Sequence, residues 1–136
     1  MSLGKLLIAE YDANKRKVLE GELQQAGYEV EAVADGEQAL ERFKRKCNSS
    51  SPDYDPYHMV ITEISLPKKD GIEVLGKILG INSKIPVILY TEYANYKDNF
   101  LAWSADAYVL KGEGIEGLLR AMESVRERRG IEVKHG

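Results

Sequence analysis

The sequence predicts a single α/β domain in which helices cover both faces of a parallel sheet. Short apolar runs alternate with amphipathic stretches along the chain, a pattern typical of strands joined by crossover helices. The length of 136 residues suits one domain, and the 43% apolar and 30% charged composition indicates a globular chain rather than a disordered one. A chain of this length buries enough surface to form a core without a disulfide or a structural metal.

Five short apolar runs are the predicted strands. They are Leu6–Ala9, Tyr28–Ala34, Met59–Ile64, Ile85–Tyr90 and Ala107–Leu110. The second run alternates apolar residues with Glu29 and Glu31, as in a strand with one polar face. The other runs are almost continuously apolar, which is typical of strands buried on both faces of a parallel sheet.

Apolar residues at helical spacing predict a helix after each strand. The first helix is expected over Ala13–Ala26, with Gly27 as its stop signal. The second, third and fifth helices are marked by the apolar residues of 39–47, 72–79 and 115–125. The fourth is expected over Tyr93–Ser104, where the helical pattern is weakest. The polar segment Asn48–Tyr57, with two prolines, is predicted to be a loop.

Composition excludes several classes of function. The net charge of −3 argues against a protein that coats nucleic acid, and we expect no direct nucleic-acid binding. The single Cys47 excludes an internal disulfide and a cysteine zinc cage. No apolar run approaches the roughly 18 residues of a membrane span, and no signal peptide is found, so a cytoplasmic location is expected.

We predict three segments along the chain. Residues 1–4 are expected to be a vector remnant or a disordered start, residues 5–129 the domain, and residues 130–136 a tail or the start of a linker. The domain is expected to be either a stand-alone protein or a fragment of a longer one.

Polar residues follow the predicted strands at the edge where ligand sites of open parallel sheets are found. They are Glu10, Tyr11, Asp12, Glu63, Thr91, Glu92 and Lys111, with Tyr108 inside the last strand. Carboxylates suit Mg²⁺, a hydroxyl can donate to a phosphoryl oxygen, and an ammonium can balance its charge. Solvated strand ends would explain any one of these residues, but their occurrence at four strand ends predicts a site for phosphoryl chemistry, active or formerly active.

Five segments, in order, carry a resemblance to a known family. They read LLIAEYD, AGYEVEAVADGEQALE, MVITEISLPKKDGIEVL, IPVILYT and SADAYVLK. The chain resembles the receiver domain of two-component response regulators from Lys5 to about Arg129. The resemblance implies a flavodoxin-like (βα)5 fold with strand order 2-1-3-4-5, for which receivers are an example.

The resemblance implies a role for each strand-end residue. Glu10 and Tyr11 fall at the positions of the family's acidic pair, and Asp12 follows them. Glu63 falls at the position of the phosphoacceptor aspartate. Thr91, Tyr108 and Lys111 match the family's hydroxyl residue, switch aromatic and lysine.

Departures from the family pattern predict a degenerate receiver, or pseudo-receiver. Glu63 is one methylene longer than aspartate, and misplacement of a nucleophile is costly in rate. Tyr11 offers a phenol in place of a metal-binding carboxylate, while Glu92 adds negative charge where the family has a small residue, and Gly112 replaces a cis-proline. We therefore expect no phosphorylation by the family mechanism, a pairing of Glu63 with Lys111, and no enzymatic activity. Binding of Mg²⁺ by Glu10, Asp12 and Glu63 is possible but weakened.

Partners and two rival functions complete the predictions. A receiver-like module of a phosphorelay acts through protein–protein interaction, here with a histidine kinase, an output domain or a second copy. The resemblance implies a working surface, and a possible homodimer, through the fourth helix, fifth strand and fifth helix. The rivals are an active Mg²⁺-dependent phosphoacceptor with an atypical acidic pocket and a small-ligand binder that uses the strand-end pocket.

Overall fold

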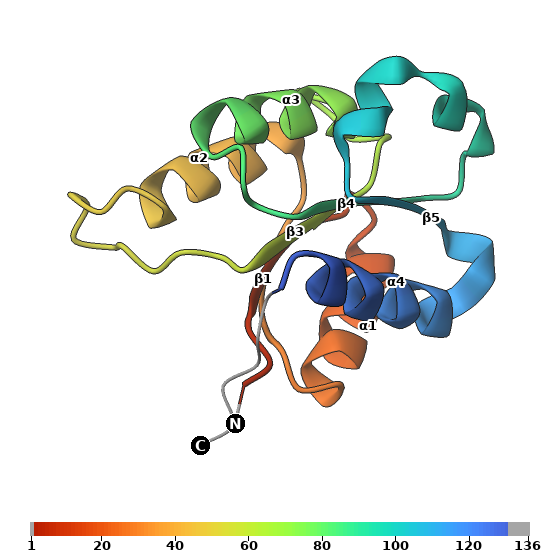
Figure 1. Ribbon diagram of the computed structural model, residues 1–136, viewed down its shortest axis with the longest axis horizontal. Helices are drawn as coiled ribbons and strands as arrows, with labels where there is room; N and C mark the ends of the chain where they lie inside the picture. Colours follow the sequence, from red (N-terminus) through yellow and green to blue (C-terminus); the bar gives the residue numbers. More distant parts are fainter. Residues whose placement is uncertain (1, 131–136) are drawn as a thin grey trace.

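A computed structural model describes residues 2–130 and contains a five-stranded parallel sheet in the order β2-β1-β3-β4-β5. The strands are β1 (Lys5–Ala9), β2 (Glu29–Val33), β3 (Met59–Thr62), β4 (Val87–Thr91) and β5 (Ala107–Leu110). Figure 1 shows the sheet nearly edge-on, with helices above and below it. The flavodoxin-like fold and its strand order are therefore confirmed.

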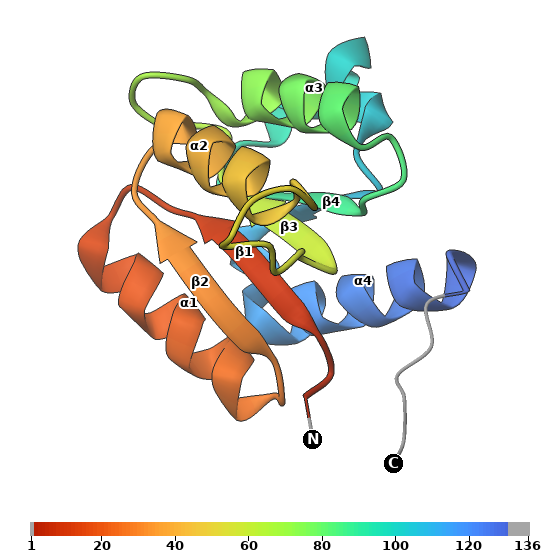
Figure 2. The ribbon, with the colours of Figure 1, turned by 90° about the vertical axis from the view of Figure 1, so that its left-hand side faces the viewer.

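Two α-helices cover each face of the sheet. Helices α2 (Gly36–Lys46) and α3 (Gly71–Ile81) lie on one face, and α1 (Ala13–Gln25) and α4 (Gly114–Arg128) lie on the other (Figures 1 and 2). An aspartate begins each of the first three helices by accepting a hydrogen bond from a free backbone amide. The pairs are Asp12 with Lys15, Asp35 with Gln38, and Asp70 with Glu73. These caps satisfy donors that a helix leaves unpaired at its N-terminus.

The fourth predicted helix is not an α-helix. The segment forms two short 3₁₀ helices, η1 (Ala94–Asp98) and η2 (Phe100–Ser104), so the last helix, predicted as the fifth, is α4. Asn99 separates the two because its backbone is extended and its side chain accepts from the Leu101 amide at 2.9 Å. A side chain that bonds to the local backbone in this way competes with a continuous helix. The prediction of one continuous helix over 93–104 was wrong for this reason.

The core forms one apolar layer on each side of the sheet. Leu7 and Val60 face α2 and α3, where they pack with Phe43. Leu6 and Ile61 face α1 and α4, with Leu118 among the helix residues of that layer. Successive strand residues point to opposite faces. The nearly continuous apolar runs of the inner strands follow from burial on both faces.

Glu31 on β2 is the centre of a polar cluster that fastens the loop between α2 and β3. Its carboxylate lies 3.1 Å from the nitrogens of both Lys5 and Arg42, and it accepts a hydrogen bond from the buried Tyr57 hydroxyl. Burial by itself would raise the pKa of Glu31, but the hydrogen bonds from Tyr57, Lys5 and Arg42 outweigh it and lower the pKa to about 2. The predicted loop 48–57 is thereby tied to the sheet at its second end.

The structure describes part of the predicted start, residues 1–4, and only the first residue of the predicted tail, residues 130–136. The Leu3 amide donates to the Gly27 carbonyl at 2.8 Å, which places Leu3 against the domain. Met1 and residues 131–136, predicted to be a start and a tail, lie outside the described residues. Among residues 2–130, no helix combines the length and the apolar character that a membrane crossing needs.

Candidate functional site

Three charged side chains meet at the carboxyl edge of the sheet. Glu10 follows β1, Glu63 follows β3 and Lys111 follows β5. The two glutamates are 5% and 6% exposed. The Lys111 ammonium forms an ion pair with Glu10 and lies 2.9 Å from Oε1 of Glu63. The predicted pairing of Glu63 with Lys111 is confirmed, and Glu10 shares the same cation.

The Lys111 ammonium is held in its charged form. Burial by itself would lower the pKa of Lys111, but its hydrogen bonds to Glu10 and Glu63 outweigh burial, and the pKa lies above its ordinary value of 10.5. The ammonium also lies 5.9 Å from the centre of the Tyr90 ring, within the range of a cation–π contact. Lys111 is therefore a fixed positive charge between two buried carboxylates.

Both carboxylate oxygens of Glu63 are engaged. While Oε1 faces Lys111, Oε2 accepts from the backbone amides of Ile64 at 2.5 Å and Ser65 at 3.2 Å. Charge-assisted hydrogen bonds of this kind are about twice as strong as neutral ones. The side chain of Glu63 is thus folded back onto the start of its own loop.

Gly71, the first residue of α3, fixes the backbone beneath Glu63. Its amide donates to the Ile64 carbonyl at 2.8 Å. A Cβ atom at this position would lie 2.1 Å from the Glu63 carbonyl oxygen and 2.8 Å from the Ile64 Cα. Only glycine permits this approach, so the start of α3 packs directly against the backbone of Glu63 and Ile64.

Tyr11 and Asp12 point away from the cluster that Glu10 enters. The Tyr11 side chain is 63% exposed. Asp12 is exposed and caps α1, and the hydrogen bond from the Lys15 amide holds the pKa of its carboxyl below the usual range. The Asp12 backbone amide donates to Glu10 Oε2 at 3.0 Å, which occupies the second oxygen of that glutamate.

These side chains do not form a ready-made carboxylate cluster for a magnesium ion. Mg²⁺ demands near-octahedral oxygen coordination, and among residues 2–130 no three His, Cys, Asp or Glu side chains are grouped so that they could hold a metal. The three predicted ligands have different partners. Asp12 caps α1, whereas Glu10 and Glu63 share the Lys111 ammonium.

Thr91 and Tyr108 converge on the turn that follows β4. The buried Thr91 hydroxyl oxygen accepts from the Tyr93 amide at 3.3 Å. The Tyr108 hydroxyl donates to the Tyr93 carbonyl. Both residues therefore hold the entry to η1, and neither forms a hydrogen bond to Glu63 within the described chain.

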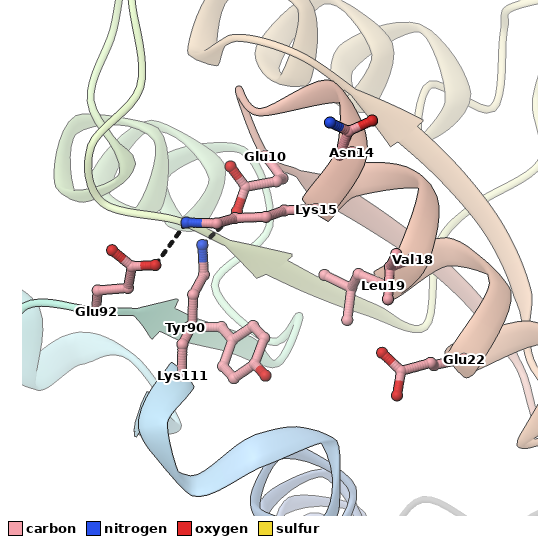
Figure 3. Close-up of a pocket in the computed structure, with 9 residues that line it drawn as sticks. All are labelled: Glu10, Asn14, Lys15, Val18, Leu19, Glu22, Tyr90, Glu92 and Lys111. Atoms are coloured by element: carbon pink, nitrogen blue, oxygen red, sulfur yellow. Dashed lines mark hydrogen bonds and ion pairs between the residues drawn. The ribbon is translucent and has the colours of Figure 1, made fainter.

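Glu92 faces Lys15 across the mouth of the site, as Figure 3 shows. The Lys15 nitrogen lies 2.6 Å from Oε1 of Glu92, and both side chains are about half exposed. The hydrogen bond from Lys15 lowers the pKa of Glu92. The negative charge that Glu92 adds is thus balanced by a residue of α1.

Four contributors to the site were missed by sequence reasoning. They are Lys15, Gly71 and the backbone amides of Ile64 and Ser65. No local pattern marks Lys15, because its partner Glu92 is 77 residues away. Every residue except proline has a backbone amide donor, so the residue types at 64 and 65 do not indicate this role. Gly71 by itself would suggest only a turn.

Comparison with known proteins identifies relatives of this chain. The family model for the response regulator receiver domain matches residues 6–123. The probable transcriptional regulator ycf27 of Porphyridium aerugineum is 32% identical over 130 residues, which are 94% of this chain and 50% of that protein. Other curated relatives are also longer than this chain, which spans about half of their length or less.

Two solved structures are also similar. The response regulator TrrA of Thermotoga maritima, in complex with Mg²⁺ and BeF, is 30% identical with a TM-score of 0.80, covering 92% of this chain and 99% of that one. TrrA in the crystal structure with the histidine kinase ThkA is 31% identical with a TM-score of 0.77, covering 92% and 98%.

Proposed function

This chain belongs to the response regulator receiver family, and from that premise we propose that it is a pseudo-receiver: a module of two-component signalling that is not phosphorylated on Glu63, catalyses no reaction of its own and acts through protein–protein contact. The single observation that carries the proposal is the state of Glu63. Both of its carboxylate oxygens are already bound, one by Lys111 and the other by two backbone amides.

Phosphorylation of Glu63 would require a free carboxylate oxygen in line with the phosphorus atom. To attack, Oε1 would have to leave the Lys111 ammonium, or Oε2 the amides of Ile64 and Ser65. Each of these contacts holds negative charge that the attacking oxygen needs. The family's aspartate is also one methylene shorter, so Glu63 starts from a different position, and errors of about 1 Å in placement can cost a hundredfold in rate.

The charge balance supports a site that works without a metal. Two buried carboxylates need a compensating cation, since buried unpaired charges are strongly unfavourable. Lys111 supplies that cation in contact with both glutamates. To enter the site, Mg²⁺ would have to displace the Lys111 ammonium. Tyr11, which stands where the family has an acidic residue, offers no carboxylate as a ligand.

The partner surface that we propose lies on η1, η2, β5 and α4. Phe100 and Trp103 on η2 are each 70% exposed, which leaves apolar area available for a partner. The Tyr108–Tyr93 hydrogen bond fixes this segment to β5. With Glu63 and Lys111 paired at the carboxyl edge of the sheet, the domain presents this surface in one state without a phosphoryl signal.

The partner is a histidine kinase, an output domain or a second copy of this chain. TrrA, which this chain resembles, is found with the kinase ThkA. The curated relatives are about twice as long as the matched segment, and several are named as transcriptional regulators. A further domain in the same protein is therefore a natural partner for this module.

Two measurements test the function. The chain is incubated with acetyl phosphate and Mg²⁺, and its intact mass is recorded. In parallel, amide NMR spectra are recorded with Mg²⁺ and then with beryllofluoride, which stands in for a phosphoryl group. We expect no added phosphoryl group and no localised shifts at Glu10, Glu63 or Lys111. A phosphoryl group mapped to Glu63 overturns the proposal.

A reconstructed site provides the positive control. The triple variant Glu63→Asp, Tyr11→Asp and Glu92→Ala removes three of the four departures from the family pattern and leaves Gly112 in place. We expect it to show localised Mg²⁺ and beryllofluoride shifts under the same conditions. The single variant Glu63→Asp separates the contributions, because failure to bind Mg²⁺ there would assign the remaining block to Tyr11 or Glu92.

A further inference from the structure

A pocket of about 350 Å³ opens beside the charged cluster, between α1 and the ends of β4 and β5. It is distinct from the place of the Glu63 carboxylate, which does not line it. Figure 3 shows α1 on one side, Tyr90 at the base and the Lys15–Glu92 pair at one end. The volume falls in the range of about 300–1,000 Å³ that small-molecule sites occupy.

The floor of the pocket is apolar. Leu19 and the ring of Tyr90 are buried at its base, and Val18 at its rim is 60% exposed. Val18 and Leu19 are neighbours on α1 whose side chains both border this space. An exposed valine next to a hollow of this size leaves apolar surface that a ligand could cover.

Among the charged side chains that line the pocket, Glu22 alone has no ion-pair partner within residues 2–130. Lys15 pairs with Glu92, and Lys111 pairs with Glu10. Glu22, one turn after Val18 on α1, forms no ion pair among residues 2–130. In Figure 3 the Glu22 carboxylate and the Tyr90 hydroxyl lie toward the same end of the pocket, away from the Lys15–Glu92 pair. The carboxylate without an ion-pair partner therefore lies at this end of the pocket.

We propose that this pocket binds a small amphipathic amine, with its ammonium between the Glu22 carboxylate and the Tyr90 hydroxyl and its apolar body against Val18 and Leu19. The ammonium supplies the positive charge that Glu22 lacks. The Tyr90 ring adds a face that attracts cations. The inference goes beyond the proposed signalling function and does not depend on it, because neither Glu63 nor a protein partner takes part.

The charge pattern discriminates between ligand classes. An anion of the same size would meet Glu10, Glu22 and Glu92, while both lysines are already engaged. A neutral alcohol could cover the apolar floor but would leave Glu22 without a counter-charge. An amine is the one class among these three that matches both the floor and the free carboxylate.

The test is an amide NMR titration of the whole 136-residue chain with phenethylamine as the probe. We expect saturable shifts at Leu19, Glu22, Tyr90 and Lys111. The same titration uses 2-phenylethanol as a neutral analogue and 3-phenylpropionate as an anionic one. Both analogues are expected to bind at least about threefold more weakly than the amine, because they lack the ion pair with Glu22 and a partly exposed ion pair changes a dissociation constant by about this factor.

Two variants with the same change of charge complete the experiment. Glu22→Gln is expected to weaken phenethylamine binding at least about threefold. Glu20→Gln lies on the same helix outside the pocket, forms no ion pair among residues 2–130, and is expected to leave binding unchanged. The amide spectrum of each variant reports its folding directly. Absence of saturable shifts, equal binding of the anion, or an unchanged affinity of Glu22→Gln overturns the proposal.

Discussion

Lys111 and Glu63 stand 2.9 Å apart, nitrogen to carboxylate oxygen, at the buried carboxyl edge of the sheet. Glu10 contacts the same ammonium, so one cation is shared by two carboxylates that come from different strands. This relationship joins the ends of β1, β3 and β5. It makes Lys111 a structural element of the site as well as its counter-charge.

Lys111→Met should therefore destabilise the domain. The variant retains much of the side-chain volume but leaves Glu10 and Glu63 without their cation, and breaking a buried pair costs about 3 to 5 kcal/mol. We expect a loss near the lower figure, about 3 kcal/mol, in urea unfolding at pH 7. Lys17→Met, at an exposed position of α1 without an ion pair in the described chain, is the matched control and should change stability little.

Wild type and Lys111→Met are also expected to differ in how their unfolding free energy depends on pH. The folded-state pKa of Lys111 lies above 10.5, so its contribution to stability is complete below that value. It is lost as the pH rises through the folded-state pKa. The difference in unfolding free energy between wild type and Lys111→Met should be constant between about pH 7 and pH 10 and should shrink above 10.5. A difference that grows with rising pH would contradict the assignment.

Gly71→Ala tests the close approach of α3 to Glu63. The new methyl group would lie 2.1 Å from the Glu63 carbonyl oxygen, so the backbone must shift. Overpacking of this kind costs about 1 to 3 kcal/mol. The control is Gly76→Ala in the same helix, where a Cβ has no neighbour within 4 Å. That change should stabilise the domain by up to about 1 kcal/mol through helix propensity. Thermal unfolding of both variants separates the two effects.

Glu31→Gln tests the cluster that fastens the α2–β3 loop. The pKa of Glu31 is lowered from 4.5 to about 2, so its charge stabilises the fold above pH 4.5, and this contribution is lost as the pH falls toward 2. Allowing for solvent screening at a partly exposed side chain, we expect a loss of about 1 to 2 kcal/mol at pH 7. The difference from wild type should shrink below pH 4.5. Glu29→Gln on the exposed face of β2 should show no such pH dependence.

Tyr108→Phe tests the contact between β5 and the turn before η1. Removal of the hydroxyl takes away the side-chain donor that Tyr108 supplies to the Tyr93 carbonyl. Loss of one hydrogen bond of about 0.5 to 1.5 kcal/mol should speed amide hydrogen exchange over residues 93–99 roughly two- to tenfold. Tyr54→Phe, in the α2–β3 loop, removes a hydroxyl that forms no hydrogen bond among residues 2–130. Equal exchange in both variants would show that the Tyr108 hydroxyl does not hold the turn.

The predicted strands and four of the five predicted helices recur in the structure because local burial patterns encode them. The run Met59–Ile64 predicts β3, and the stop at Gly27 predicts the end of α1. The segment 93–104 departs from its prediction because Asn99 bonds to the Leu101 amide, a choice that composition does not reveal. Apolar spacing reports which face is buried, and only indirectly which backbone hydrogen bonds form.

The order of residues was enough to predict the alternation of strands and helices, the edge at which polar residues gather, and a glutamate at position 63 where the family has its acceptor aspartate. Which of those residues meet follows from the folded structure. Tyr11 turns to solvent, Asp12 caps a helix, and Lys15 reaches Glu92 from a distant part of the chain. The physical reason is that residue spacing constrains neighbours along the chain, whereas an ion pair between strand ends depends on sheet register and side-chain reach, which exist only in the folded molecule.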